Sequence, residues 1–372
     1  MKATVADIIE VMGAIAPTRL AEAWDNVGLQ VGQKDWPVKK IWIALDPSPD
    51  VVSAACQKNI DLLITHHPLI FKPLRSIDFN SATGNSIRLA AQNQLALFAA
   101  HTNFDSAAGG LNDTLAQRIG LANLKTLDKS GDSGIYKLVV CVPLKYEQEF
   151  LHAFVDNHTA EIRRYSDDAF KTRGRRILKP DSSDGLRDGN ANDIFRSTQI
   201  TFESVIHGGD LDGVIDKLMD IHPDMAVSYD IYPLQATNKE WGLGRIGELA
   251  KSQDLRSFAL DIKKTLGLAS VKVAGDLSLT ITRAAVCTGS GSSLMKVFLA
   301  SGAQAFISGD LHYHDAKEVQ TAKRGLIDIG HFASEHLIIE VLAQRLSRLL
   351  TDKDFNVTVA AYRLEKDPFV SL

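Results

Sequence analysis

The stretch IDLLITHH, residues 60–67, decides the fold, because a continuous apolar run ends there in two histidines. A run of this kind is typical of a strand that is buried on both faces of a sheet. Similar runs lie at 41–46 (IWIALD) and 95–105 (LALFAAHTNFD). Helical patterns flank these runs at 4–14, 50–58, 85–93 and 111–119. Apolar strands that alternate with helices predict a mainly parallel sheet covered by helices on both faces.

The last third of the chain repeats this alternation. Strands are predicted at 279–287, 303–310, 326–330 and 355–362, and helices at 292–300, 315–323 and 334–350. The same kind of α/β architecture is therefore expected at both ends of the sequence.

The middle of the chain has a different pattern. Residues 135–157 predict a strand and then a helix, and a polar stretch without periodicity follows at 163–198. A strand, a helix and a strand are then predicted at 198–206, 213–222 and 226–234. Two halves of this kind suggest a ferredoxin-like α+β unit. We therefore predict a discontinuous three-layer α/β domain from 1–127 plus 246–372, with an inserted ferredoxin-like domain at 128–245.

Composition restricts the class of protein. The chain has 372 residues, of which 45% are hydrophobic, and its formal net charge is −4. This balance argues against a nucleic-acid-binding protein, which usually carries a basic face. Asp7 and Glu10 interrupt the first turns, unlike a signal peptide, and no apolar run is long enough for a membrane span. Cys56, Cys141 and Cys287 are scattered and form no C-x-x-C pair, so we expect buried thiols and a cytoplasmic protein.

Polar side chains follow four predicted strands at the point where each strand ends. Ligands of open α/β sheets bind outside the carboxyl ends of the strands, so we expect these side chains to meet at one sheet edge. They are His66 and His67; His101 and Asp105; Asp310, His312 and His314; and His331 and Glu335.

Imidazole nitrogen and carboxylate oxygen together suit a divalent metal such as Zn²⁺, Mn²⁺ or Fe²⁺. His66 and His67 would project in opposite directions on an extended strand, so they serve one ion only if the backbone turns, as Pro68 suggests. His331 and Glu335 meet on one helix face if a helix has begun there. Each signal alone is weak, since paired histidines are more often structural, but their convergence favours a metal site.

Three other motifs leave alternatives open. TGSGSS (288–293) is equally consistent with a phosphate-binding helix start and with a plain tight turn. GLGRIG (242–247) matches the dinucleotide-binding pattern but follows a polar linker, so a tight return from the insert is preferred and no nucleotide cofactor is predicted. In WDNVGLQVG (24–32), Asp25 and Asn26 either hydrogen-bond metal ligands or cap backbone groups, with the structural reading slightly favoured.

Seven motifs occur along the chain: WDNVGLQVG, ITHHPLIF, AAHTNFD, GLGRIGEL, TGSGSS, SGDLHYHDA and IGHFASE. Together they resemble the GTP cyclohydrolase 1 type 2 family, also called the Nif-three-like proteins, over nearly the whole chain. The resemblance implies two divalent metal ions (Zn, Mn or Fe) held by His66, His67, Asp105, His331 and Glu335. It also implies a ring-shaped homo-oligomer, commonly a hexamer, and a PII-like or CutA-like insert. Residues 161–176 (EIRRYSDDAFKTRGRR) depart from the glycine-rich and Cys-Ser-Phe pattern common in such inserts.

These patterns support two hypotheses about function. The first is a metal-dependent hydrolase acting on a nucleotide or related heterocycle; for GTP, water would attack C8 and His314 or Asp310 would serve as general acid or base. The second is a non-catalytic metal-binding scaffold, metallochaperone or regulator. A dinucleotide-dependent oxidoreductase is not expected, because GLGRIG lacks the required strand and helix context.

Overall fold

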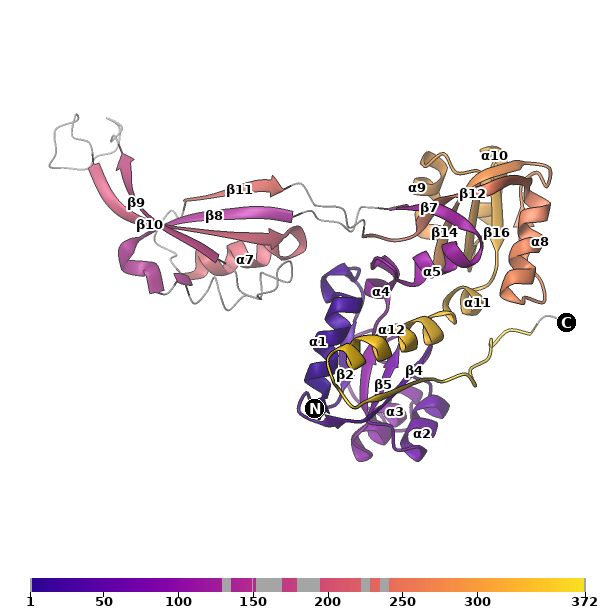
Figure 1. Cartoon of the computed structure of the whole chain (residues 1–372), viewed down its shortest axis with the longest axis horizontal. Coiled ribbons are helices and arrows are strands. Elements are labelled where there is room, and N and C mark those ends of the chain that lie inside the picture. The colour runs from indigo at the N-terminus through magenta and orange to yellow at the C-terminus, as the bar shows by residue number, and fades with distance from the viewer. Residues whose placement is uncertain are drawn as a thin grey trace. The chain divides into compact units, whose positions relative to one another are not determined.

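The computed structural model of the chain describes residues 2–128, 135–148, 150–151, 169–178, 195–221, 228–234 and 241–370 (Figure 1). Two compact units can be distinguished. One combines Met1–Gly131 with Glu240–Leu372, and the other comprises Asp132–Lys239. All of the predicted metal ligands belong to the first unit.

The first unit contains a five-stranded sheet in the order β17-β4-β5-β6-β2. Its parallel strands are β17 (Thr358–Ala361), β4 (Lys40–Ala44), β5 (Leu62–Thr65) and β6 (Ala96–Ala99). Strand β2 (Gly28–Val31) runs antiparallel to β6. All four residues of β5 are buried, which explains the uninterrupted apolar run in the sequence.

Helices cover both faces of this sheet (Figure 1). α1 (Val5–Ile15) and α12 (Ile338–Asp352) pack on one face through apolar residues that include Ile8 and Leu342. α2 (Pro49–Gln57) and α3 (Ala82–Gln92) pack on the other face. Apolar residues on both faces form two separate cores with the sheet between them, so this part of the unit has three layers.

A second, six-stranded sheet in the same unit has the order β13-β16-β15-β14-β12-β7. β14 (Thr280–Ser290), β15 (Ala305–Gly309) and β16 (Gly325–Asp328) are parallel. β13 (Lys272–Ala274), β12 (Arg245–Asp254) and β7 (Leu121–Thr126) pair antiparallel at the two sides. α5 (Leu111–Arg118) and α8 (Leu255–Leu266) share one core with this sheet, and α9 (Met295–Ala300) and α10 (Tyr313–Thr321) share another.

The expectation that the site residues follow strands of a single sheet edge is therefore wrong. The strands of the first third and most of those of the last third belong to two sheets, each with its own cores. β7 and β17 are exceptions, because the early strand β7 pairs with β12 of the second sheet and the late strand β17 pairs with β4 of the first. Hydrophobic periodicity identifies buried strands but carries no information about which of them pair.

The unit Asp132–Lys239 contains an antiparallel sheet in the order β11-β8-β10-β9. Its strands are β8 (Ile135–Pro143), β9 (Ala169–Leu178), β10 (Phe195–His207) and β11 (Ser228–Leu234), and α7 (Gly208–Ile221) joins β10 to β11. β9 lies within the stretch predicted to be polar and without periodicity, and its pairing with β10 makes it a strand. The predicted helix beyond residue 151, and residues 161–168 of the divergent stretch, lie outside the described residues.

Two expectations, about membrane-spanning segments and about the cysteines, can be compared with the structure. No helix in the described part of the chain is long and apolar enough to cross a membrane. All three cysteines are free, but only Cys287 is buried, while Cys56 and Cys141 are partly exposed. The prediction of three buried thiols is therefore wrong for two of them.

Candidate metal centre

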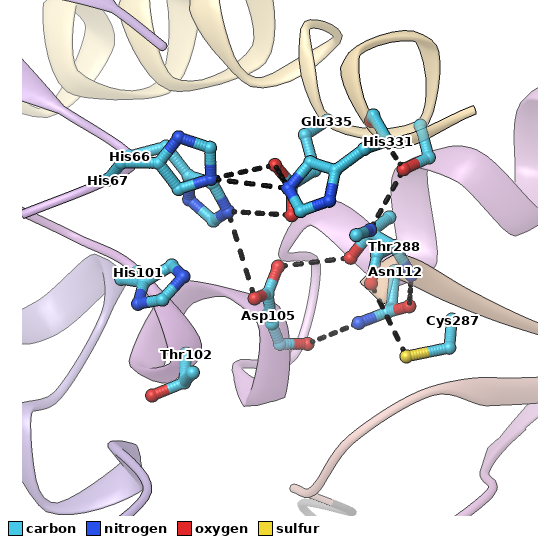
Figure 2. Close-up of polar contacts among 12 residues, drawn as sticks. His66, His67, His101, Thr102, Asp105, Asn112, Cys287, Thr288, His331 and Glu335 are labelled. Atoms are coloured by element: carbon cyan, nitrogen blue, oxygen red, sulfur yellow. Dashed lines mark hydrogen bonds and ion pairs between the residues drawn. The ribbon is translucent and has the colours of Figure 1, made fainter. Parts of the chain in front are cut away.

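The five predicted ligands converge from the ends of both sheets in the first unit (Figure 2). His66 and His67 follow β5, where the backbone bends before Pro68, and their ring centroids lie 5.2 Å apart. Asp105 lies on α4 (Thr102–Ser106), directly after β6. His331 and Glu335 are the first and last residues of α11 (His331–Glu335), which follows β16.

Glu335 stands at the centre of this group, because its two carboxylate oxygens face different partners (Figure 2). Oε1 lies 3.5 Å from His66 Nε2. Oε2 lies 3.0 Å from His67 Nε2 and 2.9 Å from His331 Nε2. Asp105 Oδ2 lies 3.8 Å from His66 Nε2, and the Nε2 atoms of His67 and His331 are 3.5 Å apart. The donor atoms thus divide into two neighbouring sets that share one carboxylate.

Burial divides the same group into a floor and a rim. His66 is fully buried, and Asp105 and Glu335 are 6% and 3% exposed. The side chains of His67 and His331 are 24% and 36% exposed. Ligands on the rim leave the group accessible from solvent, as a site that exchanges small molecules requires.

The electrostatics of the group favour positive charge within it. Burial opposes ionisation of Glu335, yet His66 and His331 hold its pKa well below the ordinary value. Burial would lower the pKa of His67, but hydrogen bonds to Asp46 and Glu335 raise it to about 10. The hydrogen bond to Glu335 likewise raises the pKa of His331 to about 9, against the effect of burial. The raised pKa values of His67 and His331 show that the carboxylates around them favour a bound cation, which can be a proton or a metal ion.

The donor set fits a bound metal. His66 Nε2 is buried and has no hydrogen-bond partner among the residues that the structure describes. Donor atoms around a zinc-sized ion lie roughly 3 to 3.5 Å apart, given metal–ligand bonds of about 2 Å. The separations of 2.9–3.8 Å between these nitrogens and oxygens are of that size. Mixed imidazole and carboxylate donors suit Zn²⁺, Mn²⁺ or Fe²⁺.

Each histidine is oriented by an acceptor on its other ring nitrogen. His66 Nδ1 donates to the carbonyl of Ala100 at 2.9 Å. His67 Nδ1 donates to Asp46 Oδ1 at 2.7 Å, and His331 Nδ1 donates to Asp310 Oδ2 at 2.8 Å. These contacts leave all three Nε2 atoms turned toward the shared centre, as is usual for metal-binding histidines.

A second layer of contacts fixes the carboxylates. Thr288 Oγ1 donates to Asp105 Oδ1 at 3.1 Å. Asn112 joins the two segments, because its side chain donates to the Asp105 carbonyl and accepts from Thr288 N. Gly289 N donates to Ser334 Oγ at 2.8 Å, directly before Glu335. TGSGSS therefore supports the donor group, and two of its amides are already paired within the protein.

His101 was noted in the sequence but not predicted as a ligand, and the structure brings it to the edge of the group. Its Nδ1 donates to Asp25 Oδ1 at 2.9 Å. One of its ring nitrogens lies within 4.8 Å of a ring nitrogen of His66 and of one of His67. Asp25 Oδ2 accepts from both Thr102 N and Thr102 Oγ1. Asp25 thus caps the backbone at Thr102 and orients His101, which is not one of the predicted ligands. The H-x-x-x-D spacing of HTNFD was the signal for His101.

The two residues expected as general acid or base, Asp310 and His314, differ in their position relative to the donor group. Asp310 contacts His331 at the rim, whereas His314 is exposed on α10 and packs against Tyr313. In GLGRIG, Gly242 and Gly244 have left-handed φ angles of 130° and 66°, which fits the predicted tight return. Arg245 of this motif is buried, with its guanidinium on Asp113 and on backbone carbonyls, so it holds the polypeptide together rather than a nucleotide.

An α/β chain that gathers three imidazoles and two carboxylates at converging strand ends carries groups that could hold a metal ion. Residues 3–368 match the family described as Duf34/NIF3 (NGG1p interacting factor 3), and the chain belongs to this family. The resemblance inferred from the seven motifs is thereby confirmed.

Relatives and solved structures match the chain almost end to end. A Bacillus subtilis protein named GTP cyclohydrolase 1 type 2 homolog is 32% identical over 367 residues, which cover 98% of each chain. A crystal structure of a Bacillus cereus protein related to NIF3 is 31% identical, with a TM-score of 0.71 over 99% of each chain. Staphylococcus aureus protein SA1388 is 29% identical, with the same TM-score and coverage.

Proposed function

We propose that this protein is a dinuclear metal-dependent hydrolase that acts on a nucleotide or a related heterocycle. The observation that carries the proposal is the division of the Glu335 carboxylate, with Oε1 toward His66 and Oε2 toward His67 and His331. A carboxylate that faces two donor sets is suited to bridge two ions. Three histidines and two carboxylates are too few to close two coordination shells, and open positions are typical of catalytic sites.

Two bound divalent ions would supply an acidic water molecule at neutral pH and charge stabilisation for the substrate. His66, Asp105 and Glu335 would hold one ion, and His67, His331 and Glu335 the other. Asp46 and Asp310 would keep the histidine tautomers in which Nε2 is the free donor atom. The contact between Asp310 and His331 Nδ1 supports a positioning role for Asp310. The acid–base role expected for Asp310 and His314 stays a prediction.

Metal stoichiometry and turnover together test this proposal. Reconstitution with Mn²⁺ or Zn²⁺ should give two ions per chain, and Glu335→Ala should lose both, whereas Asp105→Ala should lose chiefly one. Metal-loaded protein should release formate from GTP or open the ring of a related purine. Two bound ions without turnover of any purine would favour the non-catalytic scaffold instead, and failure to bind metal would contradict both hypotheses.

We also propose that Asp132–Lys239 is a ferredoxin-like unit inserted between two segments of the metal-binding domain. Support comes from its antiparallel sheet, in which the first and third strands of the unit, β8 and β10, are central neighbours, and from α7 between β10 and β11. Replacing residues 132–239 with a short glycine-serine linker should leave metal binding intact. The homohexamer implied by the resemblance is a further proposal, which light scattering of the full chain tests.

A further inference from the structure

A cavity of about 530 Å³ lies at the carboxyl ends of β4 and β17. Its walls come from the residues that follow β4, the residues that follow β17, the loop after His67 and the first turns of α3. The volume is typical of a small-molecule site. The predicted metal ligands are not among the lining residues, so this cavity is separate from the metal centre.

The position of the cavity has a topological reason. The chain leaves β4 through α2, which packs on one face of the sheet, while α12, which leads into β17, packs on the opposite face. The cavity is a crevice between the segment that follows β4 and the segment that follows β17. Open α/β sheets bind their ligands in such a crevice.

One polar group in the cavity wall is left without a partner. Ser86 is fully buried, and its Oγ has no hydrogen-bond partner among the residues that the structure describes. It nevertheless lines the cavity. A buried hydroxyl without a partner is costly. The Oγ atom exposes less than 1 Å², so a bound ligand would satisfy it after a small shift of the cavity wall.

The charges of the lining select the ligand. Asp46, Asp50 and Glu365 contribute three carboxyl groups and Lys366 one ammonium group. An excess of carboxylates disfavours phosphate, although the first turn of α2 borders the cavity. Carboxylates instead accept hydrogen bonds from sugar hydroxyls, as an acidic residue does for the ribose of dinucleotides. The apolar side chains of Leu69 and Tyr362 provide contact surface for a ring.

Asp46 links the cavity to the metal centre, because it lines the cavity and also accepts from His67 Nδ1 at 2.7 Å. Glu365 fixes the opposite wall, since its carboxylate oxygens accept from Leu45 N and Asp46 N, each at 2.8 Å. A ligand in the cavity therefore lies one side chain away from a predicted metal ligand.

We propose that this cavity between the ends of β4 and β17 binds the sugar hydroxyls of a nucleoside-sized ligand, with Ser86 as a hydrogen-bonding partner. The shared chemistry is a vicinal diol, which a nucleoside and a free sugar both carry. The choice of a nucleoside rests on the function proposed above, whereas the diol site rests on the cavity alone.

Calorimetric titration of the full-length, metal-free protein tests the site independently of the metal ions. Guanosine should bind, and 2′,3′-dideoxyguanosine, which lacks the diol, should bind at least about tenfold more weakly. Binding of D-ribose as tightly as guanosine would assign the cavity to sugars, and weaker binding of ribose would assign it to nucleosides. Inorganic phosphate should not compete; binding of phosphate that depends on Ser86 would overturn the diol assignment.

Two variants locate the binding. Ser86→Ala should weaken guanosine binding about fivefold to tenfold and leave the melting temperature unchanged, because the hydroxyl has no protein partner to lose among the described residues. Ser53→Ala on α2, outside the lining, is the matched control. Ala82→Trp, an exposed position at the rim, should block the cavity without disturbing the core. Absence of guanosine binding, or binding that neither Ser86→Ala nor Ala82→Trp weakens, would overturn the proposal whether or not the protein hydrolyses purines.

Discussion

Gly289 packs directly against the carboxylate of Glu335. A Cβ atom at position 289 would lie 2.3 Å from Glu335 Oε1, and the φ angle of Gly289 is +63°. No side chain fits between this backbone and the carboxylate. Gly289 therefore limits the positions that the Glu335 carboxylate, the proposed bridging group, can occupy.

Gly289→Ala should therefore displace Glu335 and weaken metal binding at least about tenfold, as changes beside metal ligands commonly do. Isothermal titration with Mn²⁺ measures the effect. Gly302→Ala is the matched control, because Gly302 has a similar φ of +79° but a Cβ atom there would meet no described atom within 4 Å. Gly302→Ala should keep the metal affinity of the wild type and lose only about 1–3 kcal/mol of folding stability through backbone strain. Equal metal affinity in the two variants would contradict this account.

Asp310→Asn should lower metal affinity about tenfold to a hundredfold, because the carboxylate orients His331 through a 2.8 Å contact. Asp315→Asn serves as the control, since Asp315 bonds Ser292 and the His312 backbone outside the metal centre. A loss of turnover at unchanged metal affinity would instead support Asp310 as the general acid or base.

Part of the loss of stability at acidic pH should come from protonation of Asp25. Burial opposes ionisation of this carboxyl, but hydrogen bonds from His101 and Thr102 outweigh burial and lower its pKa from 3.8 to about 2. Because the folded-state pKa lies below the unfolded-state value, this carboxylate stabilises the fold above about pH 4, and the contribution is lost as the pH falls toward 2. Asp25→Asn should cost on the order of 1–2 kcal/mol at pH 7.

Urea unfolding of metal-free protein at pH 7, 5 and 3 measures that difference. The gap between the wild type and Asp25→Asn should stay constant from pH 7 to 5 and narrow at pH 3. A gap that widens as the pH falls would mean that the carboxylate is not ionised in the folded protein.

Arg245→Met should destabilise the first unit by about 3–5 kcal/mol, because it removes one partner of a buried ion pair. Arg245 is 2% exposed and lies 2.9 Å from Asp113. The exposed pair Arg283–Glu248 supplies the control, and Arg283→Met should change stability by less than about 1 kcal/mol. Thermal unfolding compares the two, and similar melting temperatures would show that the Arg245 contacts contribute little.

The sequence was most informative where the chain is most buried. β4, β5, β6, β14 and β15 all lie within or largely within predicted strands, because a strand covered on both faces must be apolar throughout. β7 and β12 were not predicted as strands. β12 lies between β14 and the edge strand β7, and much of its later half (LAKSQD) is exposed, so its composition resembles that of a loop. α8 was also missed, although its amphipathic pattern is present in LRSFALDIKKTL.

The five predicted ligands were among the histidines and acids that follow apolar strands, and the family resemblance selected them from that larger set. Their orienting partners gave no such signal. Asp46 is separated from His67 by 21 positions, and Asp113 is separated from Arg245 by 132. Only the fold brings these pairs together, since one acidic residue among 45 is indistinguishable from the others in sequence.

The pairing of β4 with β17 has a consequence for biosynthesis. Lys40 pairs with Thr358, so the ribosome completes one partner more than 300 residues before the other. At ~5–20 residues per second, the edge of β4 stays bare for roughly 15 to 60 seconds. During that time the nascent chain exposes an apolar strand that no later segment has yet covered. This sheet therefore closes only after β17 has been synthesised, and until then the unpaired edge of β4 can pair with the strand edges of other chains.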